Sequence, residues 1–256
     1  MKTSSLLGAS LLLALAAHGA TPHVIAHRGY WDTEGSAKNS IRALVKADSI
    51  GCWGSEFDVW MTADSALVIN HDAEINGINI EHSTAAEVCA CQLANGENVP
   101  TLEQFLTVAK GLAVRLVCEI KSHDSRSNEK ACIERTLAMF KKFGLEDRVE
   151  YVTFSKNGLL QLIESVPAGT SVQYPAGDYI PEQMKAFRGN GLNYRCKKLR
   201  NEPELIKRCH DLGISVKAWK ILGPKDLKWC IEHGVDFITS DSPETHLREL
   251  EKIAKP

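Results

Sequence analysis

Two acidic residues lie two positions apart in the apolar segment Gly54–Trp60, which is typical of a β-strand. Successive side chains of a strand point to opposite faces, so Glu56 and Asp58 share one face while Phe57 and Val59 lie on the other. Carboxylates held this close repel each other, and hard divalent ions such as Mg²⁺ or Ca²⁺, which prefer oxygen ligands, relieve that repulsion. The residues favour a metal site, and a salt-bridged or solvated acidic pair is the alternative.

A second charged strand is predicted at Val114–Lys121. Its alternation places Glu119 and Lys121 on one face, while Cys118 and Ile120 point toward the surrounding helices. The charged set of the two strands and the preceding loop comprises Glu56, Asp58, Glu119, Arg28 and Lys121. Such a set is unstable as a simple buried core, but a divalent cation and a phosphate diester would give each charge a counterpart.

Two histidines complete the set of residues that could do chemistry. His27 stands at the end of an apolar segment and is followed by Arg28 and Gly29, a glycine that lets the backbone turn. His71 lies in a later loop and is followed by Asp72. His71 either faces His27 across a substrate or is an ordinary loop histidine, and its position alone leaves both alternatives open.

Short β-rich segments alternate with amphipathic helical segments along the whole chain, which predicts repeated βα units around a parallel sheet. The predicted helices include 40–50, 101–110, 128–143, 203–212 and 224–233. The eight predicted strands are 24–27, 54–60, 114–121, 149–154, 170–174, 191–194, 215–219 and 237–240. We therefore expect an α/β fold of the (β/α)8 TIM-barrel type, rather than an open doubly wound sheet, because no Gly-x-Gly-x-x-Gly motif follows the first strand.

One stretch breaks the βα rhythm. A short apolar run at 66–70 is followed by a polar and irregular stretch at 72–100, which we interpret as a small insertion after the second strand. The active sites of TIM barrels are built from the loops that follow the strands. We therefore expect this insertion to border the active site.

Taken in order, these motifs resemble the glycerophosphodiester phosphodiesterase family. The resemblance covers nearly all of the chain after residue 20. It rests on His27-Arg28-Gly29, Glu56-x-Asp58, His71-Asp72, Val99-Pro100-Thr101-Leu102 and Glu119-x-Lys121, with weaker matches at Trp219 and at Ser240-Asp241-Ser242-Pro243.

The resemblance implies metal-dependent hydrolysis of glycerophosphodiesters to an alcohol and glycerol 3-phosphate. It implies that His27 and His71 are the acid/base pair, and that Arg28 and Lys121 contact the phosphate. It further implies that Glu56, Asp58 and Glu119 bind one divalent cation, Mg²⁺ or Ca²⁺, and that Trp219 lines the substrate pocket. Two segments depart from the family pattern: Ala37-Lys38-Asn39-Ser40 stands where many members have Pro-Glu-Asn-Thr, and Trp219 is followed by Lys220-Ile221 rather than by small polar residues.

The N-terminal residues predict an exported protein. Lys2 precedes an apolar run that ends in small residues at Gly19-Ala20, as in a secretory signal peptide. We expect a signal peptide at 1–20, a barrel domain at 21–256, and a periplasmic or secreted enzyme without stable membrane insertion. Cys52 is the first cysteine, so no lipoprotein cysteine follows the signal. Export would permit disulfides among the eight cysteines, whose pairing the sequence leaves open.

Composition and charge restrict the class of partner. The chain has 44% hydrophobic and 24% charged residues and a formal net charge of -2, so we expect a small-molecule substrate and no nucleic acid. The oligomeric state is open. Two alternatives to the family reaction are a sphingomyelinase-D-like or phosphoinositide-directed phosphodiesterase and, from another class, a barrel that binds a phosphate ester without cleaving it.

Overall fold

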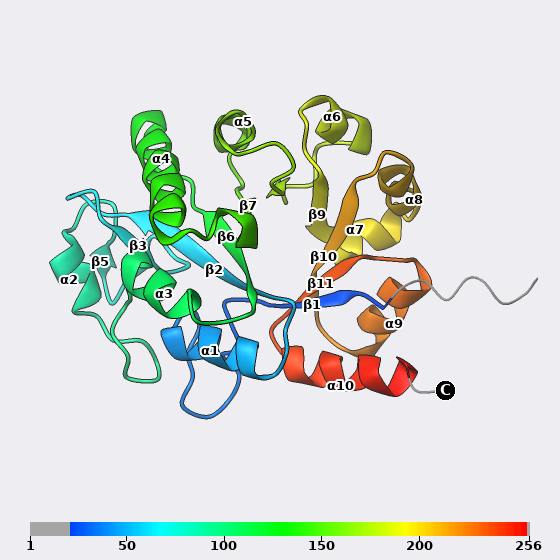
Figure 1. Cartoon of the computed structure of the whole chain (residues 1–256), viewed down its shortest axis with the longest axis horizontal. Helices are drawn as coiled ribbons and strands as arrows, with labels where there is room; N and C mark the ends of the chain where they lie inside the picture. The colour runs from blue at the N-terminus through cyan, green and yellow to red at the C-terminus, as the bar shows by residue number, and fades with distance from the viewer. Residues whose placement is uncertain (1–20, 255–256) are drawn as a thin grey trace, which may run out of the picture.

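Eight parallel strands close into a barrel in the computed structural model, which describes residues 21–254 (Figure 1). β1 pairs with both β2 and β11, and this double pairing closes the ring. In order around the barrel, the strands are β1 (His23–Ala26), β2 (Gly54–Met61), β6 (Arg115–Ile120), β7 (Val149–Val152), β8 (Val172–Gln173), β9 (Gly191–Arg195), β10 (Ser215–Ile221) and β11 (Phe237–Ser240). The predicted TIM barrel is confirmed, and every predicted strand overlaps an observed one.

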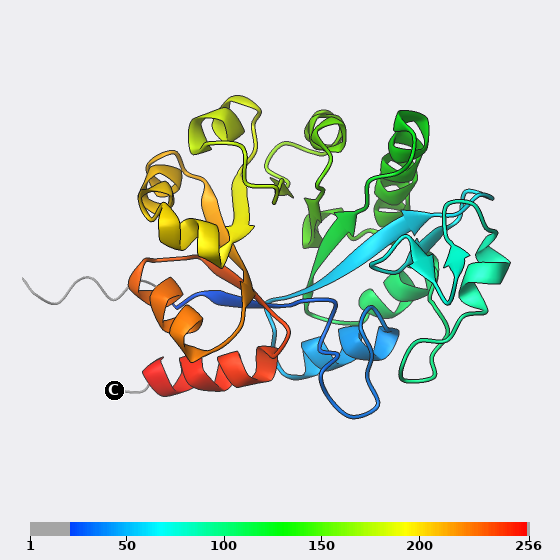
Figure 2. The same ribbon diagram turned by 180° about the vertical axis from the view of Figure 1, so that it is seen from behind.

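Helices surround the barrel on its outer side (Figures 1 and 2). Several begin where the sequence supplies a capping side chain: the Ser40 hydroxyl, for example, accepts a hydrogen bond from the Ala43 amide at 3.0 Å. The outer helices are α1 (Ile41–Ser49), α3 (Leu102–Ala109), α4 (Arg126–Phe143), α5 (Lys156–Ser165), α6 (Pro181–Ala186), α7 (Cys196–Asn201), α8 (Glu204–Asp211), α9 (Pro224–Glu232) and α10 (Pro243–Ala254), with a short 3-10 helix η1 (Glu146–Arg148) before β7.

The insertion after β2 is more regular than the sequence indicates. It contains β3 (Leu67–Ile69), which pairs antiparallel with β2, a small hairpin of β4 (Glu74–Ile75) and β5 (Ile78–Asn79), and helix α2 (Ala85–Cys89). Thr84 and Glu87 form a reciprocal capping box that starts α2, and this local signal overrides the polar composition. The insertion extends from the β2 side of the barrel, at the left of Figure 1 and the right of Figure 2.

The apolar core lies mainly between the strands and the helices. Phe57, Cys118 and Ile120 are fully or almost fully buried there, which confirms that the charged residues between them point into the barrel. Inside the barrel, by contrast, a buried polar network lies beside a small apolar layer. Lys217 pairs with Glu150, and the Glu150 carboxylate also accepts a hydrogen bond from the side-chain nitrogen of Gln173 at 2.9 Å. The barrel interior is therefore partly ionic.

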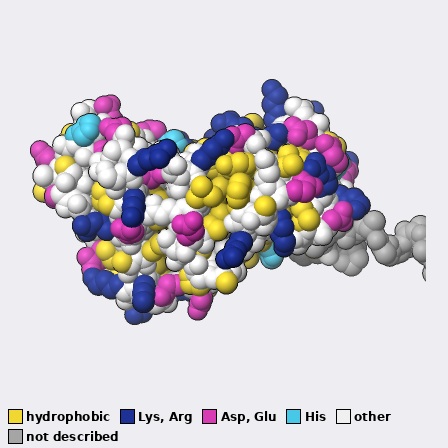
Figure 3. All heavy atoms as spheres, turned by 90° about the horizontal axis from the view of Figure 1, so that it is seen from above, with side chains coloured by type: hydrophobic (Ala, Val, Ile, Leu, Met, Phe, Trp, Pro, Cys, Tyr) yellow, Lys and Arg dark blue, Asp and Glu magenta, His cyan; other side chains and the backbone are white. Residues whose placement is uncertain are grey.

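All eight cysteines are free thiols in the structure. Within residues 21–254, no helix is long and apolar enough to cross a membrane. The face seen in Figure 3 mixes basic and acidic side chains around a central apolar area, so this face carries no large field of one sign. The predicted signal peptide, at 1–20, lies outside the described residues.

Candidate active site

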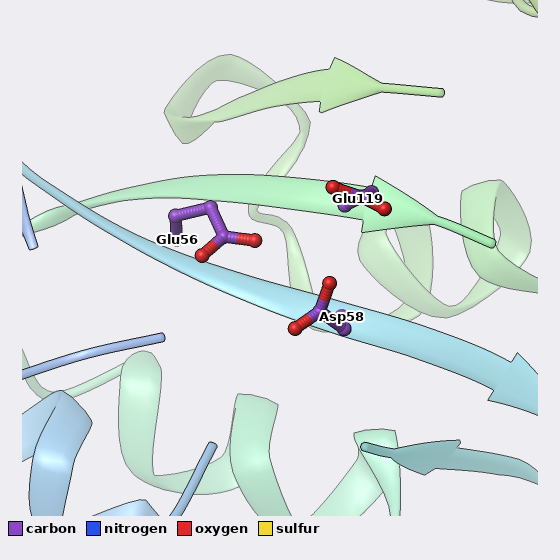
Figure 4. Close-up of side chains that lie close together, drawn as sticks. All are labelled: Glu56, Asp58 and Glu119. Carbon is purple, nitrogen blue, oxygen red and sulfur yellow. The ribbon is translucent and has the colours of Figure 1, made fainter. Parts of the chain in front are cut away.

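Three carboxylates from neighbouring strands meet on the inner side of the barrel. Asp58 of β2 stands directly beside Glu119 of β6 in the parallel ladder, and Glu56 lies two residues earlier on β2 (Figure 4). One oxygen from each of the three carboxylates lies within 4.8 Å of the others. The expected convergence of Glu56, Asp58 and Glu119 is confirmed, and the cluster could bind a metal ion.

Burial and mutual repulsion raise the pKa values of two of these acids. Burial, and then repulsion by Asp58 and Glu119, raises the pKa of Glu56 well above its ordinary value. Burial and the Asp58 charge raise the pKa of Glu119 to about 7. A divalent cation would favour the ionised form of both acids, and three hard oxygen donors suit such an ion. The donor set therefore fits Mg²⁺ or Ca²⁺ without choosing between them.

Lys121 lies against the same cluster. Its Nζ atom is 2.6 Å from Glu119 Oε1 and 3.1 Å from Asp58 Oδ1. Burial alone would lower the pKa of Lys121, but the charges of Asp58 and Glu119 outweigh burial and raise it. Lys121 is thus a cation held at the edge of the carboxylates and facing the cavity, where a phosphate oxygen could reach it.

Asn39 orients Asp58 and was not singled out by the sequence. Its side-chain nitrogen donates a hydrogen bond to Asp58 Oδ2 at 2.9 Å, and its side-chain oxygen accepts a longer one from the Asp58 amide at 3.4 Å. Asn39 is 3% exposed and has a positive φ of 61°, a conformation that asparagine tolerates better than most residues. The only sequence signal was its place in the segment Ala37-Lys38-Asn39-Ser40.

A tight turn after β1 brings Arg28 to the carboxylates. The Arg28 amide donates to Glu56 Oε2 at 2.7 Å, and its Nε atom lies 3.9 Å from Asp58 Oδ2. Gly29 has a φ of 76°, and a β-carbon at this position would come within 2.6 Å of the Ala43 β-carbon. Glycine is required here because the turn packs directly on α1, which fixes the direction of the Arg28 backbone.

His27 is held by Asp241, which belongs to the weaker motif Ser240-Asp241-Ser242-Pro243. The His27 Nδ1 atom lies 2.6 Å from Asp241 Oδ1, in the loop after β11, and Asp241 also pairs with Lys220 and accepts a 3.4 Å hydrogen bond from the Trp31 indole. A carboxylate only accepts hydrogen bonds, so Nδ1 carries the proton and Nε2 of a neutral His27 is free to accept one. Asp241 therefore sets the tautomer of His27.

His71 lines the same cavity but is held less firmly. Its Nδ1 atom lies 2.7 Å from Asp72 Oδ1, and the Asp72 side chain is 79% exposed. Burial lowers the pKa of His71 below 6.5, and the Lys121 and Arg28 charges also lower it, while Asp58 and Asp72 act in the opposite direction. The structure brings His71 and His27 to one cavity, as the sequence led us to expect.

The cavity has a volume of about 550 Å³ and opens at the carboxyl ends of the strands. Trp219 lines it, and its indole donates to the Asn193 carbonyl at 3.2 Å. Lys38, the departure from the family pattern, does not line the cavity: it is exposed and lies with Nζ 4.3 Å from the centre of the Trp31 ring. All the predicted site residues line the cavity except Asp58, which lies beneath the others and is fully buried.

Comparison with known proteins agrees with this geometry. The family model described as the glycerophosphoryl diester phosphodiesterase family matches residues 27–245. The chain belongs to this family. It is therefore a phosphoric diester hydrolase of the glycerophosphodiester phosphodiesterase type, which confirms the resemblance seen in the motifs.

Three relatives show the range of similarity. A glycerophosphodiester phosphodiesterase from Parabacteroides distasonis has a solved structure with 42% identity and a TM-score of 0.89, over 92% of this chain and 99% of that one. A glycerophosphodiester phosphodiesterase from Caldanaerobacter subterraneus is 27% identical over 90% of this chain and 98% of its own length. A phosphodiesterase from Oleispira antarctica, solved in complex with the product sn-glycerol-3-phosphate, is 21% identical with a TM-score of 0.77, over 90% of this chain and 97% of that one.

Proposed function

We propose that this enzyme hydrolyses glycerophosphodiesters to an alcohol and glycerol 3-phosphate, using one divalent cation and acid/base catalysis by His27 and His71. The observation that carries the proposal is the position of the carboxylate cluster in a cavity that both histidines line. The product bound to the Oleispira antarctica relative supports glycerol 3-phosphate as the product. A divalent ion bound to Glu56, Asp58 and Glu119 would supply a Lewis acid that polarises the phosphate.

The other side chains of the cavity have separate roles in phosphate binding, proton transfer and substrate packing. Arg28 and Lys121 lie beside the carboxylates and would neutralise the non-bridging phosphate oxygens as charge develops on them. One histidine takes the proton of the attacking oxygen, and the other gives a proton to the departing alkoxide. Trp219 forms part of the wall against which the rest of the substrate packs.

The overall reaction balances simply. A new bond forms between phosphorus and a water oxygen, and the bond between phosphorus and the alcohol oxygen breaks. The base histidine ends the reaction protonated and the acid histidine ends it deprotonated, so loss of one proton from the first to water and uptake of one by the second restore the starting protonation state. If a neighbouring hydroxyl of the substrate attacks first, the same two residues act in each of two steps.

The direct test measures release of glycerol 3-phosphate from a panel of glycerophosphodiesters with Mg²⁺, with Ca²⁺ and with a chelator. We expect turnover that the chelator abolishes and the ion restores. His27→Ala and His71→Ala should each lower turnover at least about 10²-fold, the usual scale for general acid/base catalysis. His82→Ala is the matched control, because His82 also contacts an aspartate, Asp124 at 3.3 Å, but lies outside the cavity.

Three outcomes would overturn parts of this proposal separately. Full activity in the chelator would remove the metal from the mechanism. Near-normal turnover after either cavity substitution would remove that histidine from the acid/base pair. Cleavage of a sphingomyelin or a phosphoinositide, with none of the glycerophosphodiesters, would replace the substrate class.

We also propose that the enzyme is exported to the periplasm or secreted, without a lipid anchor. The support is the charged, apolar and small-residue order of 1–20. N-terminal sequencing of the protein recovered from its native host should find a mature start near Ala20 or Thr21. A mature chain that begins at Met1 would contradict the proposal.

A further inference from the structure

Arg195 lies on the wall of the cavity that faces the carboxylate cluster. Alternation along β9 turns Leu192 and Tyr194 into the outer core, while Asn193 and Arg195 line the cavity. β9 is the fourth strand from β2 in either direction around the closed barrel, so it stands opposite the strand that carries Glu56 and Asp58. Arg195 therefore lies across the cavity from the cluster, within the same wall that a substrate bound at the cluster would meet.

Arg195 differs from the other cations of the cavity in having no carboxylate partner. Lys121 pairs with Asp58 and Glu119, Lys217 with Glu150, and Lys220 with Asp241. Within residues 21–254, no carboxylate lies within ion-pair distance of Arg195. The Arg195 side chain is also exposed at the cavity mouth. Its positive charge is available to a ligand.

Aromatic side chains hold the guanidinium in place. The guanidinium carbon lies 4.6 Å from the centre of the Trp219 ring, and Phe154 packs edge-on against Trp219 with ring centres 5.8 Å apart. Stacking on an aromatic face orients the planar guanidinium and limits the freedom it would lose on binding. A quaternary ammonium head group would need this same aromatic face, which the enzyme fills with its own cation.

The sum of the charges in the cavity favours a second anionic group on the substrate. Glu56, Asp58 and Glu119 carry three negative charges when ionised, and Arg28 and Lys121 carry two positive ones. A divalent ion brings this group to a net charge of one positive, which the single negative charge of a phosphodiester balances. The cluster is then neutral with substrate bound, and Arg195 remains as one uncompensated positive charge across the cavity.

We propose that Arg195 is a specificity-determining residue that selects glycerophosphodiesters whose alcohol part carries a second anionic group, such as a second phosphodiester. The inference rests on the proposed function and names the substrate class of that same site. The guanidinium donates two parallel hydrogen bonds to the oxygens of the second anion, as arginine does with phosphates. Choline-type head groups are correspondingly disfavoured, because they place a positive charge beside Arg195.

The test compares three diesters: glycerophosphocholine, with a cationic alcohol; glycerophosphoglycerol, with a neutral one; and bis(glycerophospho)glycerol, with an alcohol that bears a second phosphodiester. For wild-type enzyme, kcat/KM for bis(glycerophospho)glycerol, corrected for its two cleavable bonds, should exceed that for glycerophosphoglycerol by about tenfold or more, the usual effect of a hydrogen-bonded charge pair. Arg195→Gln should abolish most of this preference, and Arg195→Lys should retain part of it. Arg135→Gln, which removes an exposed arginine of α4 outside the cavity, should leave it unchanged.

The preference ratio decides the outcome. If Arg195→Gln keeps the wild-type ratio, or if the wild type does not favour the doubly anionic diester, the inference is overturned although the proposed function stands. If the wild type cleaves none of the three, the proposed function fails, and calorimetric binding of the same diesters in the presence of Ca²⁺ then decides the inference. Weaker binding of bis(glycerophospho)glycerol alone in Arg195→Gln supports the role of Arg195, and equal loss for all three diesters refutes it.

Discussion

Replacing Asp241 by asparagine keeps the size of the side chain but removes the charge that orients His27. Asparagine can also turn its amide toward Nδ1 and donate to it, which moves the imidazole proton to Nε2. A neutral His27 would then present a donor where the reaction needs an acceptor. The perturbation therefore tests the tautomer of His27 rather than its presence.

The structure gives the scale of the effect. The Nδ1 to Oδ1 distance is 2.6 Å, and the two side chains are only 16% and 23% exposed, so water replaces this contact poorly. Hydrogen bonds that involve a charged group contribute about 1.5–3 kcal/mol, which corresponds to a loss of about 10- to 100-fold in kcat. Asp241 does not line the cavity, so KM should change much less than kcat.

The assay is steady-state release of glycerol 3-phosphate from glycerophosphoglycerol at saturating divalent ion. Asp124→Asn is the matched control, because Asp124 contacts His82 on the surface, where both side chains are about two-thirds or more exposed. A kcat for Asp241→Asn within about threefold of wild type, less than 1 kcal/mol, would refute the orienting role of Asp241.

The same substitution has a pH signature in stability. Burial alone would raise the pKa of Asp241, but the hydrogen bonds from His27 and Lys220 outweigh it and hold the pKa well below 3.8. A carboxyl whose folded-state pKa is depressed stabilises the fold above its ordinary pKa, and that contribution is lost as pH falls through the folded-state value. The Tm of wild type should therefore exceed that of Asp241→Asn at pH 7, and the difference should shrink in strong acid. A difference that does not depend on pH would contradict the charge pairing.

Two further substitutions test the supports of the site. Asn39→Ala removes the side-chain amide that holds Asp58. It should raise the divalent-ion concentration needed for half-maximal activity by about tenfold or more. An unchanged ion titration would show that Asn39 does not support the metal site. Lys217→Met leaves Glu150 buried without its cation and should lower the free energy of unfolding in urea by about 3–5 kcal/mol, while Lys217→Met combined with Glu150→Gln should recover most of that loss. A double variant no more stable than Lys217→Met alone would show that the ion pair does not account for the loss.

Strand periodicity explains why the metal cluster could be predicted. Glu56 and Asp58 share a face because they are two residues apart, and the same rule pairs Glu119 with Lys121. That β2 and β6 are neighbours also follows from the fold, because the insertion between them adds the antiparallel strand β3 and a separate β4–β5 hairpin but no further barrel strand. Local alternation and one topological rule were therefore enough to place four of the charged side chains.

Residues outside this periodicity could not be assigned in the same way. Asp241 meets His27 across 214 residues of sequence, and Asn39 meets Asp58 from a loop with a positive φ. Neither contact has a repeating signal, because each depends on where a loop passes the end of the barrel. Lys38 is the converse case: its departure from the family pattern is obvious in the sequence, and its side chain lies on Trp31, outside the cavity.

The two histidines also differ in what supports them, and this difference follows from their elements. His27 comes directly after β1, and its amide donates to the Ser240 carbonyl of β11, so the barrel itself carries both His27 and Asp241. His71 belongs to the insertion, where the Trp60 indole donates to its carbonyl at 3.4 Å and the Asn70 side chain donates to the Asp72 carbonyl at 2.7 Å. These contacts fix the backbone at the start of the insertion but leave the His71 side chain 39% exposed. The barrel thus determines the position of His27, whereas His71 enters the cavity only because β3 pairs with β2 and returns the chain to the cavity mouth.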